Sequence, residues 1–403
     1  MNKNFLFCRI LDLEEVLKNK SFFLLGPRQT GKTTLLKEIK GCLYINLLDP
    51  DDYLSLCARP LLLKELIKGR WPSPTSARHS GYKAVVIDEI QKLPSLLDVV
   101  HLLMEEDKRL RFLLTGSSAR KLRAHNVNTL GGRAGKQLFL PIVSEELRST
   151  NNHNKNINDL LQYGGLPSVL LATDPWDKLK DYVGLYLREE IQAEALTRNL
   201  QNFSRFLQTS ALINGEQLNY TKVANDAQVP ARTVKDYFQV LEDTLVGYQL
   251  ESFRPKISRK FVSIPKFYFF DIGVANYLLG RKSLSKGTGD YGKAVEHLVF
   301  TELFAYIHLV KHGDARIFYW RTQTQQEVDF IIDCGEGLIA IEVKASGALS
   351  AKHFHGMKAL SNEVKLKKKI FVSTEKHRRL TENHDQIYPL ELFLEELWRG
   401  DLF

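Results

Sequence analysis

Residues 24–33 read Leu-Leu-Gly-Pro-Arg-Gln-Thr-Gly-Lys-Thr, and this stretch decides the fold. Its spacing is G-x-x-x-x-G-K-[ST]. It lies between an apolar segment, 22–25, that favours a strand and a segment, 34–39, that favours a helix. Strand, loop and helix in this order are the context in which such a motif binds phosphate groups. The stretch therefore predicts a phosphate-binding loop in an α/β domain. The alternative is an ordinary glycine-containing turn that happens to carry Lys-Thr.

Each part of the loop has an expected role in binding ATP and Mg²⁺. Gly26 and Gly31 allow backbone N–H groups to turn toward the phosphates, and the following helix N-terminus favours negative charge. Lys32 is expected to reach the β- and γ-phosphates, and the Thr33 hydroxyl to bind Mg²⁺. The remaining residues of the expected nucleotide-binding segment are Pro27, Arg28, Gln29, Thr30 and Thr34.

Two further apolar segments end in polar residues that suit a nucleotide site. Residues 84–89, Ala-Val-Val-Ile-Asp-Glu, form a Walker B pattern, in which Asp88 would hold Mg²⁺ and Glu89 would polarise the attacking water. Residues 111–118 end in Thr-Gly-Ser-Ser, so Thr115 or Ser117 could sense the γ-phosphate as a sensor 1 residue. Both could equally be simple turn residues.

The composition is that of a soluble globular protein with two to four domains. The 403 residues are 44% hydrophobic and 26% charged, with a net charge of +9 and a sequence pI near 9.1. A basic balance favours a polyanionic partner without requiring one. We find no membrane-spanning run and no signal-peptide pattern, and the four cysteines are scattered. These features predict a cytoplasmic protein with reduced thiols, no zinc site and no membrane partner.

Four strings together resemble one family of predicted AAA+ ATPases with a C-terminal region of formerly unknown function. They begin at Gly26, Val86, Leu114 and Leu130, and the resemblance extends from about residue 5 to residue 345. It implies that ATP binds between subunits of a ring-like homo-oligomer, with a hexamer as the expected number. Arg133 would then be the arginine finger supplied to a neighbour, although a surface arginine in a glycine-rich loop is the alternative. The Gly164-Gly165-Leu166-Pro167 segment resembles an element of related ATPases in which Pro167 would pack on adenine, unless it is only a turn.

The middle of the chain predicts lid helices and then a DNA-binding fold. Residues 151–205 are expected to form the helical lid. Segments 220–227 and 231–241, separated by a turn, predict a helix–turn–helix whose second helix buries Val234, Phe238 and Leu241. A basic, aromatic segment follows, as in a winged helix. The expected DNA contacts are Arg232 and Lys235 on the second helix and Arg254, Lys256, Arg259, Lys260 and Lys266 on the wing. A structural adaptor without DNA contact is the alternative.

The C-terminal region carries a separate set of acidic residues and a lysine. Residues 327–332 and 338–344 predict two strands of a hairpin that brings Asp329 near Glu342 and Lys344. Together with Glu296 on a preceding helix, these residues resemble the PD-(D/E)XK nuclease fold. The resemblance implies that Glu296, Asp329 and Glu342 bind Mg²⁺ and that Lys344 assists cleavage with Glu342. Such domains also occur as DNA-binding or structural scaffolds.

The expected fold class is therefore α/β, with a P-loop AAA+ core at 1–150, a helical lid at 151–205, a winged helix at 206–280 and a restriction-endonuclease-like domain at 281–403. The expected function is ATP-driven remodelling or translocation of duplex or branched DNA. The alternative is a nucleotide-controlled switch that assembles with a protein partner. The preferred DNA structure, the direction of movement and retained cleavage stay open.

Overall fold

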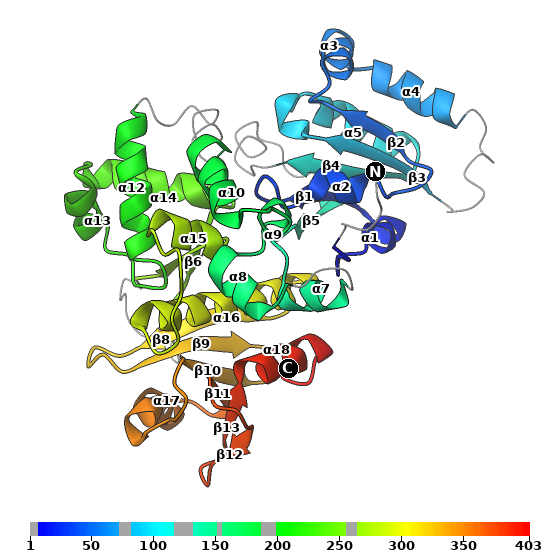
Figure 1. Ribbon diagram of the computed structural model, residues 1–403. Helices are drawn as coiled ribbons and strands as arrows, with labels where there is room; N and C mark the ends of the chain where they lie inside the picture. The colour runs from blue at the N-terminus through cyan, green and yellow to red at the C-terminus, as the bar shows by residue number, and fades with distance from the viewer. Residues whose placement is uncertain (1–6, 72–81, 117–131, 151–154, 187–198, 255–263) are drawn as a thin grey trace. The chain divides into compact units, whose positions relative to one another are not determined.

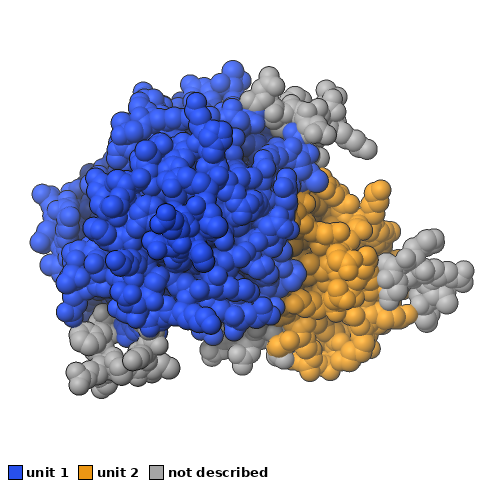
Figure 2. Space-filling view, turned by 90° about the horizontal axis from the view of Figure 1, so that it is seen from below, with its two compact units in different colours: residues 1–8, 141–242, 246–403 blue, residues 9–140, 243–245 orange. Residues whose placement is uncertain are grey.

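The computed structural model describes residues 7–71, 82–116, 132–150, 155–186, 199–254 and 264–403 (Figure 1). The chain divides into two compact units (Figure 2). The smaller unit consists of residues 9–140 and 243–245, and the larger unit of residues 1–8, 141–242 and 246–403. Within the described residues, no helix combines the length and the apolar character needed to cross a membrane.

The smaller unit is built on a parallel sheet with the strand order β2-β3-β4-β1-β5. Strands β1 and β3 are buried along their whole length, which is typical of strands covered on both faces of a parallel sheet. The strands are β1 Ser21–Leu25, β2 Leu43–Asn46, β3 Lys83–Asp88, β4 Leu110–Gly116 and β5 Ala134–Leu138. The helices are α1 Leu13–Asn19, α2 Lys32–Leu36, α3 Pro50–Ala58, α4 Leu62–Arg70, η2 Ile90–Lys92 and α5 Leu96–Glu106.

The parallel pairing places the carboxyl ends of β1, β3 and β4 at one edge of this sheet. Leu25 of β1 pairs with Gly116 of β4, and Ile87 of β3 pairs with Leu114. Because a loop that follows a buried parallel strand leaves the sheet at its carboxyl edge, the phosphate loop and the two acidic residues at the end of β3 meet there. The expected α/β class with a parallel sheet is confirmed for this unit.

The first half of the larger unit is helical and ends in a two-stranded antiparallel sheet, in which Gly247 pairs with Phe269. The predicted inner face of α14 is confirmed, because Val234, Phe238 and Leu241 are fully buried. The helices are α7 Ser144–Ser149, α8 Ile157–Tyr163, α9 Pro167–Leu170, α10 Pro175–Asp181, η4 Tyr182–Tyr186, α12 Leu200–Leu212, α13 Tyr220–Ala227, α14 Ala231–Asp243 and α15 Ile272–Leu278. The strands are β6 Gly247–Leu250 and β7 Lys266–Phe269.

The second half of the larger unit contains a mixed sheet in the order β12-β13-β11-β10-β9-β8. Its strands are β8 Arg316–Arg321, β9 Glu327–Asp333, β10 Leu338–Lys344, β11 Leu366–Ser373, β12 Arg379–Leu380 and β13 Asp385–Pro389. Its helices are α16 Gly289–Leu309, η5 Ala351–Phe354, α17 His355–Glu363 and α18 Leu390–Arg399. One face packs with α16 and α18, and the other packs with α17.

The division of the chain differs from the predicted boundaries. The smaller unit ends at Leu140 rather than near residue 150, since Ile142 and Leu147 pack in the core that contains α16 and β10. The helices expected to form a separate lid also share cores with later segments. Leu160 packs with α16, whereas Leu179 packs with α12 and α14.

Candidate functional site

The phosphate loop has the backbone geometry that its glycines predict. Gly31 is the N-cap of α2 and has a φ of 95°, a left-handed conformation that favours glycine. At Gly26 a Cβ atom would lie 2.2 Å from the Phe139 carbonyl oxygen, so only glycine fits. The Lys32 ammonium donates to the carbonyl oxygens of Gly26 (2.6 Å) and Pro27 (2.8 Å). The lysine therefore lies over the loop, where it can exchange these carbonyls for phosphate oxygens.

Asp88 lies at the centre of a hydrogen-bond cluster at the carboxyl edge of the sheet. Its Oδ2 accepts from the Thr33 hydroxyl (2.9 Å) and from the Tyr44 hydroxyl (2.9 Å), and its Oδ1 accepts from Thr115. Asp88 is fully buried. A carboxylate and a hydroxyl that face each other are hard oxygen donors, which Mg²⁺ prefers. Thr33 and Asp88 would therefore be the residues that hold the Mg²⁺ that accompanies ATP.

Glu89, next along the chain, has a different environment. Its φ is 62°, which is uncommon for a residue other than glycine and directs the chain away from the strand. Its N–H donates to the Thr115 hydroxyl (3.0 Å), and its carboxylate accepts from the side chain of Gln91. Since Asp88 is committed to three donors, Glu89 is the carboxylate of this pair that can accept a proton from water.

The structure adds three residues that the sequence analysis missed. The Tyr44 hydroxyl and the Gln91 amide orient the two acidic residues. Burial and the neighbouring Asp88 carboxylate raise the pKa of Tyr44, so its hydroxyl remains a donor. Arg9 donates to the carbonyl oxygens of Thr30 (3.1 Å) and Leu140 (2.6 Å). Arg9 and Tyr44 belong to no motif, and Gln91 lies two positions after Glu89 without a pattern that would have assigned it a role.

The other predicted residues of the loop lie where the motif places them. Thr30 is fully buried, and its hydroxyl donates to the Pro27 carbonyl oxygen (2.9 Å), which tightens the loop. Gln29 has a φ of 61°, so the chain turns there. Arg28 is partly exposed, and Thr34 is exposed on the first turn of α2. Ser117 lies outside the described residues.

The predicted acidic hairpin of the C-terminal region is present. Ile341 pairs with Phe330, and the Asp329 carboxylate accepts from the Val343 N–H (2.8 Å). Glu342 accepts from the Asp329 N–H (3.3 Å) and pairs with the Lys344 ammonium (2.6 Å). Burial, together with the Asp329 carboxylate, raises the pKa of Glu342 to about 8. Burial opposes the charge of Lys344, but the carboxylates of Asp329 and Glu342 outweigh it and raise the pKa of the lysine.

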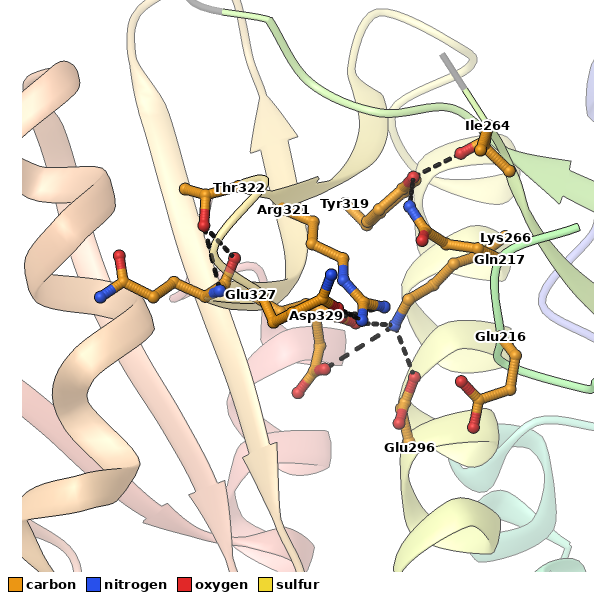
Figure 3. A network of polar contacts seen from close by, with 12 residues as sticks. Glu216, Gln217, Ile264, Lys266, Glu296, Tyr319, Arg321, Thr322, Glu327 and Asp329 are labelled. Carbon is orange, nitrogen blue, oxygen red and sulfur yellow. Dashed lines mark hydrogen bonds and ion pairs between the residues drawn. The ribbon is translucent and has the colours of Figure 1, made fainter.

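A second lysine, Lys266 of β7, lies inside this acidic region (Figure 3). Its ammonium is 3.2 Å from Glu296, 2.5 Å from Glu327 and 3.9 Å from Asp329, and its side chain is 3% exposed. Burial opposes its charge, but the surrounding carboxylates, Glu296 foremost, raise its pKa well above the ordinary value. The expectation that Lys266 contacts DNA is therefore wrong, because its side chain is buried in ion pairs.

The acidic residues do not form the predicted Mg²⁺ site in this conformation. Among the described residues, no group of three or more histidine, cysteine, aspartate or glutamate side chains is arranged to hold a metal ion. Glu296 pairs with Lys266 and accepts from the Tyr268 hydroxyl (2.7 Å), whereas Glu342 pairs with Lys344. Lysine ammonium groups thus compensate the carboxylates that the metal would need.

Comparison with known protein families agrees with the geometry of the nucleotide site. Residues 18–148 match a family described as an AAA domain. These residues of the chain form an AAA-type ATPase domain. Two further matches in the ATPase are to a domain of unknown function (DUF8612) at residues 154–285 and to a domain of unknown function (DUF4143) at residues 291–393. The interval between these two matches, residues 286–290, contains the start of α16 at Gly289.

Relatives of this AAA-type ATPase occur in mycobacteria. Uncharacterized protein Mb2031c of Mycobacterium bovis and uncharacterized protein Rv2008c of Mycobacterium tuberculosis are each 25% identical to it over 366 residues, covering 88% of this chain and 76% of theirs. Solved structures are more distant. A DNA polymerase III gamma subunit-related protein of Thermotoga maritima has 12% identity and a TM-score of 0.25, covering 72% of this chain and 83% of its own. Can2 of Sulfobacillus thermosulfidooxidans has 10% identity and a TM-score of 0.21, covering 96% and 99%. The similarity to these two solved structures is too low to support a conclusion about the fold of this chain.

Arg133 of the ATPase lies at the amino edge of the parallel sheet. It precedes β5, whose first residue, Ala134, pairs with Ser21 at the start of β1. The phosphate loop follows the other end of β1, so the two are separated by the length of the strand, about 16 Å. The guanidinium pairs with Glu105 (2.6 Å) and contacts His101 (2.8 Å) on α5. In this conformation Arg133 thus faces away from the phosphate loop of its own chain.

Pro167 of the ATPase belongs to the larger unit and opens the short helix α9. The two glycines before it are required by packing. At Gly164 a Cβ atom would lie 2.1 Å from the Asp271 carboxylate, and at Gly165 it would lie 2.2 Å from the Ile142 carbonyl oxygen. The Gly165 N–H donates to Asp271 (2.7 Å), and burial raises the pKa of Asp271 to about 6. Local packing therefore accounts for the glycines without a ligand, and the adenine contact stays a prediction.

The predicted DNA-binding residues have different environments. Arg232 and Lys235 are exposed on α14, and Arg254 is exposed after β6. Lys256, Arg259 and Lys260 lie outside the described residues.

Proposed function

We propose that this AAA-type ATPase hydrolyses ATP between subunits of a homo-oligomer and uses the energy to remodel or translocate DNA. The proposal of ATP hydrolysis rests on one observation. The hydroxyl groups of Thr33, Thr115 and Tyr44 all donate hydrogen bonds to the Asp88 carboxylate. Bound Mg²⁺ would neutralise charge on the β- and γ-phosphates. Lys32 would bind the phosphates, and Glu89 would accept the proton of the attacking water.

The oligomer is supported by the position of Arg133. A guanidinium at the amino edge of the sheet lies about one strand length from the phosphate loop of its own chain, so it suits a site on a second copy. Its partners, Glu105 and His101, are half-exposed, so the ion pair with Glu105 can be exchanged for a phosphate at small cost. We infer a closed ring, since head-to-tail contacts between identical chains form rings when the rotation closes.

Mixing two inactive variants tests this arrangement. Arg133→Ala is expected to lower ATP turnover about 100-fold while ATP binding is kept, because a donor to the transition state is lost. Mixed with Glu89→Gln, it should regain part of the turnover, since a site with Glu89 from one chain and Arg133 from its neighbour is intact. Glu105→Gln should keep turnover. A mixture that co-assembles and stays as inactive as each variant alone would contradict a finger supplied in trans.

The DNA part is supported by α12, α13, α14 and the β6–β7 pair. Three helices followed by an antiparallel pair have the element order of a winged helix, with α14 in the place of the recognition helix. Arg232 and Lys235 are exposed on α14, opposite the buried face. We propose that α14 enters a groove of DNA and that the C-terminal sheet binds DNA or supports the assembly without cutting.

ATP turnover and DNA binding with linear, single-stranded and four-way DNA test this proposal. A plot of the logarithm of the DNA-binding constant against log [salt] has a negative slope. The double variant Arg232→Ala/Lys235→Ala is expected to make this slope less steep by about 2, because two phosphate contacts are lost. The matched control is Lys178→Ala/Lys180→Ala on α10, which removes the same charge and should leave the slope unchanged. The DNA proposal fails if no DNA form binds or changes turnover.

A second function is favoured by the environment of the C-terminal acidic residues. Glu296 and Glu342 are paired with lysines rather than arranged around a metal. We therefore retain a nucleotide-controlled switch, in which the C-terminal sheet is a scaffold for a protein partner. Nucleotide-dependent assembly without any DNA binding in the same assays would favour this function.

A further inference from the structure

The acidic region between β7, α16 and β9 contains an internal cation. The Lys266 ammonium is within 3.2 Å of Glu296 and Glu327 and 3.9 Å from Asp329 (Figure 3). We propose that Lys266 takes the place of a divalent metal ion in this cluster, closes it to metals and joins the β6–β7 pair to the C-terminal sheet. This inference concerns the C-terminal cluster and does not depend on the proposed ATP-driven function.

An ammonium group and a divalent ion cannot occupy this position together. Mg²⁺ requires oxygen ligands at about 2.0–2.1 Å in octahedral geometry, and it keeps several waters. The lysine side chain is 3% exposed, and its ammonium lies between Glu296 and Glu327, where its positive charge would repel a divalent ion. One ammonium carries three N–H donors, and the carboxylate oxygens of Glu296 and Glu327 lie 3.2 Å and 2.5 Å from it.

The charges around Lys266 explain why the lysine is stable there. Glu327 also pairs with Arg321 (3.0 Å), and Glu296 accepts from the Tyr268 hydroxyl (2.7 Å). Each carboxylate near the ammonium therefore has a second partner, as buried charges require. Losing the lysine would leave Glu296, Glu327 and Asp329 close together without their shared cation.

The backbone holds Lys266 in place from both sides. Phe267 donates to the Glu216 carbonyl oxygen (3.1 Å), and Leu218 donates to that of Pro265 (2.8 Å). The Tyr319 hydroxyl of β8 accepts from the Gln217 amide (2.8 Å) and donates to the Ile264 carbonyl oxygen. Tyr319 also pairs with the chain after β6, since the Phe253 N–H donates to its carbonyl oxygen (2.6 Å). These contacts fix the backbone from which the Lys266 side chain reaches the carboxylates.

Removal of the lysine should convert the cluster into a metal site. We expect the full chain without nucleotide to bind no Mn²⁺ at this cluster, and Lys266→Met to bind one additional Mn²⁺ per chain in a calorimetric titration. The additional ion should be lost in Lys266→Met/Glu296→Gln. The matched control is Lys293→Met, which removes an exposed lysine of α16 that pairs with Glu216 (3.0 Å) and should bind no additional ion.

The wild-type chain tests the inference even if Lys266→Met folds poorly. If folded wild type binds Mn²⁺ at a site that Glu296→Gln removes, the cluster is open and the inference is wrong. If Lys266→Met is destabilised, Mn²⁺ should raise its melting temperature and leave that of wild type unchanged, because an ion that binds only the folded state stabilises it. A Lys266→Met variant that neither binds Mn²⁺ nor gains stability from it would overturn the inference.

Discussion

Replacement of Glu89 by glutamine is expected to lower ATP turnover about 1,000-fold while ATP still binds, because the proton acceptor for the attacking water is lost. Asp88 cannot take over this role. Its two oxygens already accept from Thr33, Tyr44 and Thr115. Turnover is measured as phosphate release under saturating ATP, and binding as the fluorescence of a labelled nucleotide.

Two variants separate the loss of chemistry from the loss of binding. Lys32→Ala removes the ammonium that lies over the phosphate loop, so it should weaken ATP binding as well as turnover. Glu38→Gln makes the same chemical change at an exposed glutamate beyond α2 and should behave as wild type. Wild-type turnover by Glu89→Gln would show that another group accepts the proton.

Gly273→Ala is expected to destabilise the larger unit by about 3 kcal/mol, the upper end of the usual cost of overpacking. Gly273 lies in the first turn of α15, and a Cβ atom there would be 1.9 Å from the Tyr163 carbonyl oxygen and 2.8 Å from the Gly164 nitrogen. Backbone atoms cannot move aside as a flexible side chain can. The change should therefore push α15 away from α8 and break the contact between Asp271 and Gly165. Urea unfolding followed by tryptophan fluorescence measures the effect, since Trp176, Trp320 and Trp398 lie in this unit.

The control is Gly292→Ala on the neighbouring helix α16. A Cβ atom at Gly292 would be 3.9 Å from Ala345, which is ordinary contact, and alanine favours a helix over glycine by up to about 1 kcal/mol. We expect this variant to be as stable as wild type or slightly more stable. Equal stability of the two alanine variants would contradict the close packing of α15 on α8.

Local patterns predicted the elements whose chemistry and geometry lie within one short segment. The phosphate loop is defined by the spacing of Gly26, Gly31 and Lys32, and an apolar run before Asp88 requires a buried strand. The hairpin of β9 and β10 followed from period-two alternation, which also placed Glu342 and Lys344 on one face. In each case the residues that form the sequence pattern also form the loop, strand or hairpin that the pattern predicts.

Contacts between distant segments could not be predicted in this way. Lys266 has the sequence neighbours of a basic wing, but its environment is set by Glu296 and Asp329, which follow 30 and 63 positions later. Tyr44 contacts Asp88 only because β2 pairs with β3. The end of the smaller unit at Leu140 also depends on such contacts, because the partners of Ile142 and Leu147 lie in the C-terminal half of the chain.

Arg9 links the phosphate loop to both ends of the smaller unit. The smaller unit is an insertion whose main covalent connections to the larger unit leave at Arg9 and Leu140, and the Arg9 guanidinium binds the Leu140 carbonyl oxygen. The same guanidinium holds the Thr30 carbonyl oxygen in the phosphate loop and lies 4.0 Å over the Phe139 ring. A nucleotide that displaces the phosphate loop would therefore strain the contacts that Arg9 makes at both ends of this insertion.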